Sequence, residues 1–214
     1  MKAQATQTTL ILPGWQNSGP GHWQSLWETE YGYQRVEQHD WDRPLRGDWI
    51  TRLEEVVLSQ PTDQPITLVA HSLGCLLVAA WAGISRNTHR VSSALLVAPG
   101  DVEQEALRPV LASWSPILPA GAPQTLPFKS LLLGSQNDPY CSLARARQFA
   151  DAWGSTFTDY GLRGHINSES GLKSWSDGHS LLLKLQQSPP PNFSNFPPEA
   201  GRGNTSTTTL KAEE

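Results

Sequence analysis

PITLVAHSLGCLLVAAWAGIS, residues 65–85, places two apolar runs on either side of one polar turn. The first run, residues 65–72, lacks the alternation of a half-exposed strand and is typical of a strand buried on both faces of a sheet. The second run, residues 73–85, is apolar nearly all round, which predicts a helix at the centre of the fold. A buried strand that leads directly into a buried helix therefore forms the middle of this chain.

Ser72 lies at this turn, with a small residue two positions before it and another two positions after it. The pentapeptide Ala70-His71-Ser72-Leu73-Gly74 matches the nucleophile elbow G-x-S-x-G, with Ala in place of the first Gly. Small residues let the strand and the helix approach closely, so that the serine hydroxyl projects from the carboxyl edge of the sheet. The alternative is that Ser72 is an ordinary helix N-cap. The buried runs on both sides favour the elbow.

Strand patterns alternate with helix patterns along the chain, which predicts a three-layer α/β/α fold with a mostly parallel sheet of about six strands. We expect strands at residues 8–14, 33–40, 65–72, 91–99, 127–138 and 155–161. We expect helices at residues 22–32, 48–60, 73–85, 142–154 and 175–187. Prolines recur between residues 100 and 127, which predicts a loop with one short helix within residues 103–112.

The length of 214 residues suits one domain, which we expect over residues 1–187. After Ser188 the chain is dominated by Pro, Ser, Thr, Asn and Gly, and its hydrophobic periodicity ends. Such a composition cannot bury enough apolar surface to offset the entropy of ordering. Residues 188–214 are therefore expected to be a disordered tail.

Charge and cysteine content limit the partners that the protein can have. The formal net charge is -4 and no block of Lys or Arg is present, so we expect neither a nucleic acid nor a membrane as partner. The N-terminus does not resemble a secretory signal, and we expect a cytoplasmic protein. Cys75 and Cys141 fit neither a disulfide framework nor a zinc pattern, so we expect reduced thiols and no metal or organic cofactor.

A serine hydroxyl needs a neighbouring base to act as a nucleophile. In this kind of fold an acid and then a histidine follow the serine along the chain, each at the end of a strand. Asp138 follows the expected strand at 127–138, and His165 follows the one at 155–161. His39 also follows a possible strand, and Asp101 competes with Asp138 for the role of the acid. We favour His165 as base and Asp138 as the residue that orients it.

The loop after the first expected strand is rich in glycine, so its backbone amides can approach a ligand. We expect an oxyanion hole formed by the amide of Leu73 and by that of Trp15 or Gln16. A phosphate-binding loop is the alternative, although the loop lacks both G-x-G-x-x-G and a Walker lysine. Trp15, Gln16, His71 and Trp114 are candidates for substrate binding, with ordinary burial as the alternative for the tryptophans.

Four segments of the chain together resemble the retinoblastoma-binding protein nine and YdeN-like family of small α/β-hydrolases. The segments are LPGWQNSGPGHWQSLWE, LVAHSLGC, LLLGSQNDPYCS and LRGHINSESG. The resemblance implies a minimal α/β-hydrolase fold without a large lid domain, and it places the nucleophile at Ser72, the acid at Asp138 and the base at His165. It implies no particular substrate, because many members of the family have none known.

Together these features predict a serine hydrolase that acts like an esterase on a small ester, thioester or amide. Two alternatives stay open at this point. The fold could act as a binding or scaffold module with a weak or inactive triad, although the sequence indicates no protein partner. The enzyme could also be an aminopeptidase that acts on small peptides.

Overall fold

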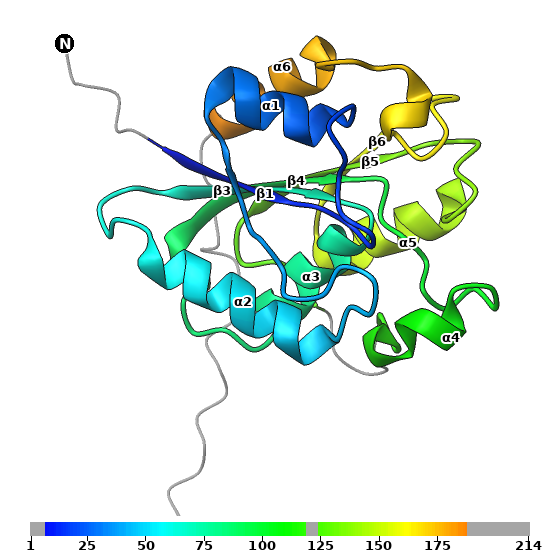
Figure 1. Cartoon of the computed structure of the whole chain (residues 1–214), viewed down its shortest axis with the longest axis horizontal. Helices are drawn as coiled ribbons and strands as arrows, with labels where there is room; N and C mark the ends of the chain where they lie inside the picture. The colour runs from blue at the N-terminus through cyan, green and yellow to red at the C-terminus, as the bar shows by residue number, and fades with distance from the viewer. Residues whose placement is uncertain (1–6, 119–123, 188–214) are drawn as a thin grey trace, which may run out of the picture.

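The computed structural model describes residues 7–118 and 124–187 of the chain. In these ranges, six parallel strands form one sheet in the order β2-β1-β3-β4-β5-β6 (Figure 1). The strands are β1 (Thr8–Leu12), β2 (Gln34–Arg35), β3 (Ile66–His71), β4 (Val91–Val97), β5 (Lys129–Gly134) and β6 (Thr156–Asp159). Each lies close to its expected position, and the predicted α/β architecture is confirmed.

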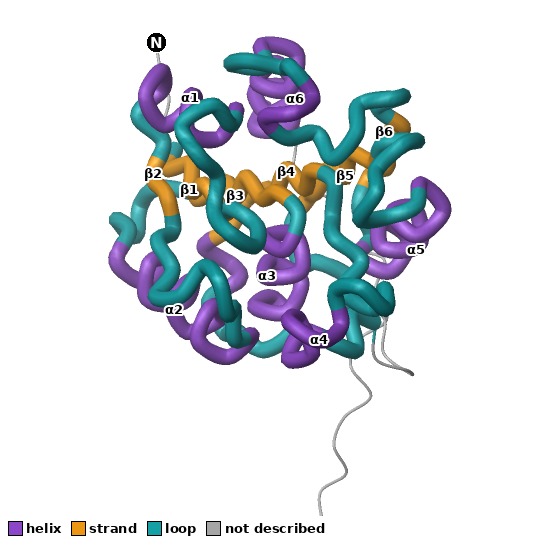
Figure 2. The backbone as a smooth tube through the Cα atoms, turned by 45° about the vertical axis from the view of Figure 1, so that its right-hand side comes forward, coloured by secondary structure: helices purple, strands orange, loops and turns teal. Residues whose placement is uncertain are grey.

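Helices cover both faces of the sheet, as parallel strands require (Figures 1 and 2). One face carries α1 (Trp23–Tyr31) and α6 (Ser176–Gln187). The other face carries α2 (Arg46–Ser59), α3 (Leu73–Ala82) and α5 (Leu143–Trp153), together with the short α4 (Arg108–Leu111). The result is the three-layer arrangement that the alternation of strands and helices predicts.

Successive residues of a strand pack alternately against the helices on the two faces of the sheet. In β1, Leu10 and Leu12 pack into the core under α2 and α3, whereas Ile11 packs into the core under α1 and α6. In β3, Leu68 faces the first of these cores and Val69 faces the second. Because both faces are apolar, these strands appear in the sequence as continuous apolar runs.

Two elements differ from their expected form. β2 is only two residues long, because β1 pairs with it solely through Leu10 and Ile11. α2 begins at Arg46, two residues before the expected start of this helix, and its N-cap is Leu45. In the segment after β4, the short helix expected within residues 103–112 is present as α4, and a 3-10 turn at Ala112–Trp114 follows it; the described residues form no separate lid domain.

The expected tail, residues 188–214, lies outside the described residues. Within the described ranges, none of the helices combines the length and the apolar character that crossing a membrane would need. The parallel sheet presents one carboxyl edge, and the loops after β1, β3, β4, β5 and β6 gather there. That edge carries every residue that the sequence proposes for chemistry except Trp114.

Candidate active site

Ser72 turns the chain from β3 into α3 with φ 54° and ψ -120°. A residue with a Cβ atom adopts a positive φ only where the surroundings hold it there. The backbone N–H of Ser72 donates to the carbonyl oxygen of Val97 in β4 at 3.0 Å, which anchors the turn to the sheet. The Ser72 side chain makes no capping hydrogen bond to α3, so the alternative of an ordinary N-cap is wrong.

Two glycines allow the elbow to close. A Cβ atom at Gly74 would overlap the carbonyl oxygen of Leu12 and lie 2.9 Å from that of Pro13, so the start of α3 passes directly against the end of β1. A Cβ atom at Gly14 would lie 2.7 Å from the Cβ atom of Ser72. The elbow motif accounts for the glycine at position 74, but the tight approach of Gly14 involves a different loop.

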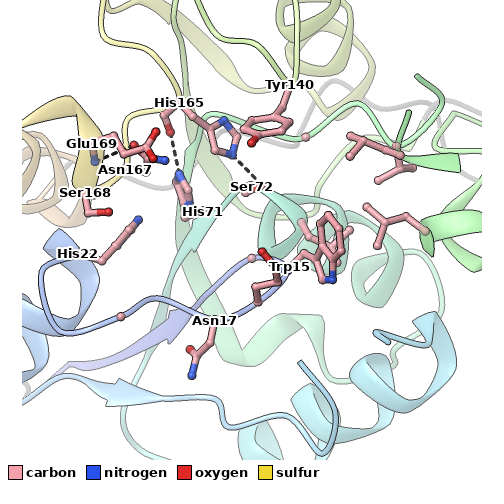
Figure 3. Close-up of a pocket in the computed structure, with 18 residues that line it drawn as sticks. Trp15, Asn17, His22, His71, Ser72, Tyr140, His165, Asn167, Ser168 and Glu169 are labelled. Carbon is pink, nitrogen blue, oxygen red and sulfur yellow. Dashed lines mark hydrogen bonds between the residues drawn. The ribbon is translucent and has the colours of Figure 1, made fainter. Parts of the chain in front are cut away.

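The side chains of Ser72, His165 and Asp138 form one hydrogen-bonded chain (Figure 3 shows its first link). Nδ1 of His165 lies 2.9 Å from each carboxylate oxygen of Asp138, and Nε2 lies 2.9 Å from Oγ of Ser72. A carboxylate can only accept, so Nδ1 carries the proton and Nε2 accepts from the serine hydroxyl. The side chains of His165 and Asp138 are 8% and 2% exposed, so little water competes for these bonds.

The two residues that compete with Asp138 and His165 in the sequence, Asp101 and His39, do not join this hydrogen-bonded chain. Asp101 accepts from the backbone N–H of Glu103 at 3.3 Å and forms an ion pair with Arg145 at 3.6 Å. His39 is exposed in the loop that follows β2, and it has no hydrogen bond to Ser72. The structure therefore brings Asp138 and His165 to the serine, as the positions of the strand ends predict.

Two backbone amides beside Ser72 have no acceptor among the described residues. They are the N–H groups of Leu73 and Trp15, and both residues line the pocket at Ser72. The N–H of Gln16 is already occupied, because it donates to the carbonyl oxygen of Trp41 at 3.0 Å. Of the two amides that the sequence offers from this loop, that of Trp15 is the one left to bind an oxyanion.

A buried polar network holds the loop that carries Trp15. Gln16 and Asn17 both have φ of 65°, so the loop needs support from its neighbours. Arg35 donates to the side chain of Asn17 and, at 3.0 Å, to the carbonyl oxygen of Ser18. Gln24 is fully buried and accepts from the Ser18 hydroxyl at 2.7 Å, while its amide donates to the carbonyl oxygens of Leu12, at the end of β1, and Val69, within β3. The sequence alone indicates neither contact.

A pocket of about 350 Å³ opens at Ser72 (Figure 3). Its lining divides by chemistry, and we name two sides of it. The apolar side consists of Trp15, Val102, Leu107 and Leu111, which pack on the core beneath α2 and α3. The polar side consists of His22, His71, Asn167, Ser168 and Glu169.

The structure separates the expected substrate-binding residues. Trp15, Gln16 and His71 line the pocket, but Trp114 does not. Its indole is 2% exposed, packs edge-on against Trp49 and donates from Nε1 to the carbonyl oxygen of Pro44 at 2.8 Å. The expectation for Trp114 is wrong, because its indole completes the core instead of facing the pocket.

Three histidine rings follow one another from the catalytic candidate into the polar side. His71 lies between His22 and His165, with ring centroids 4.8 Å from each. Its Nε2–H donates to the backbone carbonyl oxygen of His165 at 2.8 Å (Figure 3). Burial is the main reason that the pKa of His22 falls to about 3 and that of His71 falls well below its usual value. Both rings are therefore neutral at neutral pH.

Several residues that line the pocket are not among those that the sequence predicts. A Cβ atom at Gly100 would lie 3.4 Å from Oγ of Ser72, so this glycine leaves room beside the hydroxyl. Tyr140 packs edge-on against the His165 ring, with centroids 4.7 Å apart. The sequence positions of both residues indicate that they lie near the site, because Gly100 follows β4 closely and Tyr140 is two residues after Asp138.

The two cysteines are buried free thiols. Burial raises the pKa of Cys141 to about 12 and raises that of Cys75 further, so neither forms a reactive thiolate at neutral pH. Within residues 7–118 and 124–187, no group of three or more His, Cys, Asp or Glu side chains is arranged to hold a metal ion.

The fold resembles those of several proteins of known structure. The structure resembles a YdeN-like hydrolase from Pectobacterium atrosepticum with a TM-score of 0.72 and 28% identity, covering 85% of this chain and 91% of that one. It resembles the ydeN product of B. subtilis with a TM-score of 0.64 and 18% identity, covering 86% and 100%. It resembles Est1E of Butyrivibrio proteoclasticus with a TM-score of 0.64 and 11% identity, covering 86% and 90%. At these identities the last two show the fold alone.

No curated protein matches the sequence significantly. The profile of one family, described as serine hydrolase, matches residues 9–184. That match covers most of the chain and includes Ser72, Asp138 and His165. The chain belongs to the serine hydrolase family and is a small α/β-hydrolase similar to YdeN.

Proposed function

We propose that the protein hydrolyses a small carboxylic ester, thioester or amide, with Ser72 as nucleophile, His165 as general base and Asp138 as the residue that orients the base. The observation that carries this proposal is the unbroken hydrogen-bonded chain from Oγ of Ser72 to the Asp138 carboxylate. That chain gives the serine an acceptor for its proton and fixes the tautomer that can receive it.

In the first step, Oγ of Ser72 attacks the carbonyl carbon while its proton moves to Nε2 of His165. The imidazolium formed is stabilised by the Asp138 carboxylate at 2.9 Å. The same Nε2–H then protonates the leaving group, and an acyl-enzyme remains. Water attacks this ester in the second step, again with His165 as base, and the acid is released.

The negative charge that develops on the carbonyl oxygen needs donors already in place. The free amides of Leu73 and Trp15 are the candidates, since neither has an acceptor among the described residues. Loss of one such donor typically raises the barrier by about 3–4 kcal/mol. The apolar side of the pocket suits a short acyl chain, because Val102, Leu107 and Leu111 offer it no polar partner.

The experiment is to compare wild type, Ser72→Ala and the matched control Ser59→Ala, which changes an exposed serine at the end of α2. We expect Ser72→Ala to abolish both hydrolysis of p-nitrophenyl acetate and labelling by a fluorophosphonate probe, with an unchanged circular dichroism spectrum. Ser59→Ala should retain both activities. Turnover by folded Ser72→Ala would refute the assignment of the nucleophile.

The assay also separates the other two functions considered for this fold. Folded wild type that takes up no fluorophosphonate would indicate a binding module. A p-nitroanilide of an amino acid tested beside the ester distinguishes a peptidase from an esterase. Selective turnover of the anilide would replace ester hydrolysis in the proposal and keep the triad.

A further inference from the structure

One buried polar atom at the pocket has no hydrogen-bond partner in the described part of the chain. It is Nε2 of His22, a residue that is only 5% exposed. The other two such atoms belong to Gln38 and Trp153, neither of which lines the pocket. Buried donors and acceptors are nearly always paired, so an unpaired one that borders a binding pocket points to a partner on the ligand.

The other nitrogen of the His22 ring fixes its hydrogen-bonding character. Nδ1 accepts the backbone N–H of Gln24 at 3.2 Å, since His22 is the N-cap of α1. An accepting Nδ1 carries no proton, and the buried ring is neutral, so the proton is on Nε2. The unpaired group is therefore an N–H donor, and its missing partner is an acceptor.

The position of His22 tells which part of a substrate would meet this donor. Figure 3 shows the His22 ring directed towards the space between His71 and Ser168, with Asn167 and Glu169 nearby. Trp15 lies on the opposite side of Ser72 in the same view. His22 therefore belongs to the polar side of the pocket, next to the loop that carries His165.

The proposed reaction places the leaving group on that side. His165 has to protonate the leaving atom, so the rest of the leaving group extends past His165. The residues that follow His165 in the chain, Asn167, Ser168 and Glu169, line the polar side. The acyl group is left with the apolar side, where Val102, Leu107 and Leu111 lie.

We propose that the polar side is a leaving-group subsite, in which Nε2–H of His22 donates to an oxygen of the alcohol part of the substrate. The substrate class is thus an ester of a short apolar acid with an alcohol that carries a further ether, hydroxyl or carbonyl oxygen. This proposal rests on the proposed function, because it uses the acyl-transfer role of Ser72 and His165 to tell the two sides apart.

The test compares esters of similar shape that differ only in the ether oxygens of the alcohol chain, one in the first pair and two in the second. Methoxyethyl acetate is paired with butyl acetate, and methoxyethoxyethyl acetate with heptyl acetate, so that two depths of the subsite are sampled. Each ratio of kcat/KM is divided by the ratio of the alkaline hydrolysis rates, which removes the difference in intrinsic reactivity. We expect wild type to favour the oxygenated ester of at least one pair by about 3- to 10-fold, the effect of one neutral hydrogen bond.

His22→Asn should abolish this preference. Asparagine keeps an acceptor for the Gln24 amide and so preserves the cap of α1, but it lacks an N–H at the position of Nε2. His89→Asn makes the same chemical change at a histidine outside the pocket and should leave the preference intact. Ethyl methoxypropanoate and ethyl pentanoate place the oxygen on the acyl side, where we expect no preference.

The outcomes separate the subsite from the chemistry. Lack of any preference in wild type would overturn the subsite without any variant having to fold. A preference that survives in folded His22→Asn, or one found only in the acyl pair, would also overturn it. Loss of Ser72 dependence would instead reject the proposed function, and the fluorophosphonate experiment detects that failure independently of His22.

Discussion

Gly14→Ala should damage catalysis far more than folding, because the added methyl group would press the oxyanion loop away from the elbow. A Cβ atom at position 14 would lie 2.7 Å from the Cβ atom of Ser72, and 3.2 Å from both the amide nitrogen of Leu73 and the carbonyl oxygen of His71. Carbon atoms in contact are about 3.5–4.0 Å apart, so the loop and the elbow must separate by roughly 1 Å.

A displacement of about 1 Å at a catalytic site typically costs about 100-fold in rate. The moving loop carries the Trp15 amide, and loss of one oxyanion donor costs about 100- to 1000-fold in kcat. We therefore expect kcat for p-nitrophenyl acetate to fall by about 100-fold. The strain of the added methyl group should lower the free energy of unfolding by only about 1–3 kcal/mol.

Gly21→Ala is the matched control, since it makes the same change in the same loop, where a Cβ atom has nothing within 4 Å. It should retain activity within about two-fold. Steady-state kinetics and urea unfolding of the three proteins measure both quantities. If folded Gly14→Ala keeps kcat within a few-fold of wild type, or loses no more than Gly21→Ala, the close approach of this loop does not set the geometry of catalysis.

Three further predictions concern Asp138, the buried ring of His22, and Glu54 in α2. Asp138→Asn should lower kcat by about 10⁴-fold with the fold intact, because an amide no longer selects the productive tautomer of His165; a loss below ten-fold would argue against the role of Asp138. The pKa of His22 is about 3 in the folded protein and 6.5 in the unfolded chain. The unfolded state therefore binds more protons below pH 6.5, and the stability of the protein falls as the pH decreases towards 3. This contribution amounts to about 2 kcal/mol at pH 5, and urea unfolding at pH 7 and 5 should show a smaller pH dependence in His22→Asn than in wild type; equal dependence would contradict it. Glu54→Ala should destabilise the protein by about 2–4 kcal/mol with kcat unchanged. Its carboxylate accepts from Nε1 of the buried Trp81 at 2.6 Å and from two further side chains, so a loss under 1 kcal/mol by thermal unfolding would contradict the estimate.

The sequence predicts the fold, and it predicts that Asp138 and His165 lie beside Ser72, because both depend on patterns that are local in the chain. A strand buried on both faces is predominantly apolar, and residues 66–71 and 91–97 show this pattern in the sequence. The carboxyl ends of parallel strands meet at one edge, so Asp138 and His165 can be placed beside Ser72 without knowing any side-chain contact. The positions at which the strands end in the sequence are sufficient to place these two residues.

The remaining site residues depend on contacts that no local pattern specifies. Trp15 lies in a loop and Trp114 in a short 3-10 turn, and only packing decides that the first borders the pocket while the second completes the core against Trp49. His22 has the sequence context of an ordinary helix start. Its burial results from His71 and Trp23, whose rings lie 4.8 and 5.2 Å from it. β2 is short for the same reason, since its length is set by its pairing with β1.

Five of the seven non-glycine residues with positive φ in the described ranges lie in the loops that form the site. Gln16, Asn17, Ser72, Ala98 and Ile166 all adopt φ between 47° and 65°, and all belong to the loops at the carboxyl edge. Each such conformation costs free energy, which persists only where surrounding contacts determine it.

Those contacts come from the sheet and its helices. Ser72 and Ala98 donate their backbone N–H groups to the carbonyl oxygens of Val97 and Leu133 at the ends of the neighbouring strands. The carbonyl oxygen of Ile166 accepts from Nε1 of the buried Trp23 at 2.8 Å. The strained turns that direct Ser72 and His165 towards each other are thus fixed by the ordered core. The distance between nucleophile and base should therefore respond to core substitutions beneath these turns more than to changes at the exposed rim of the pocket.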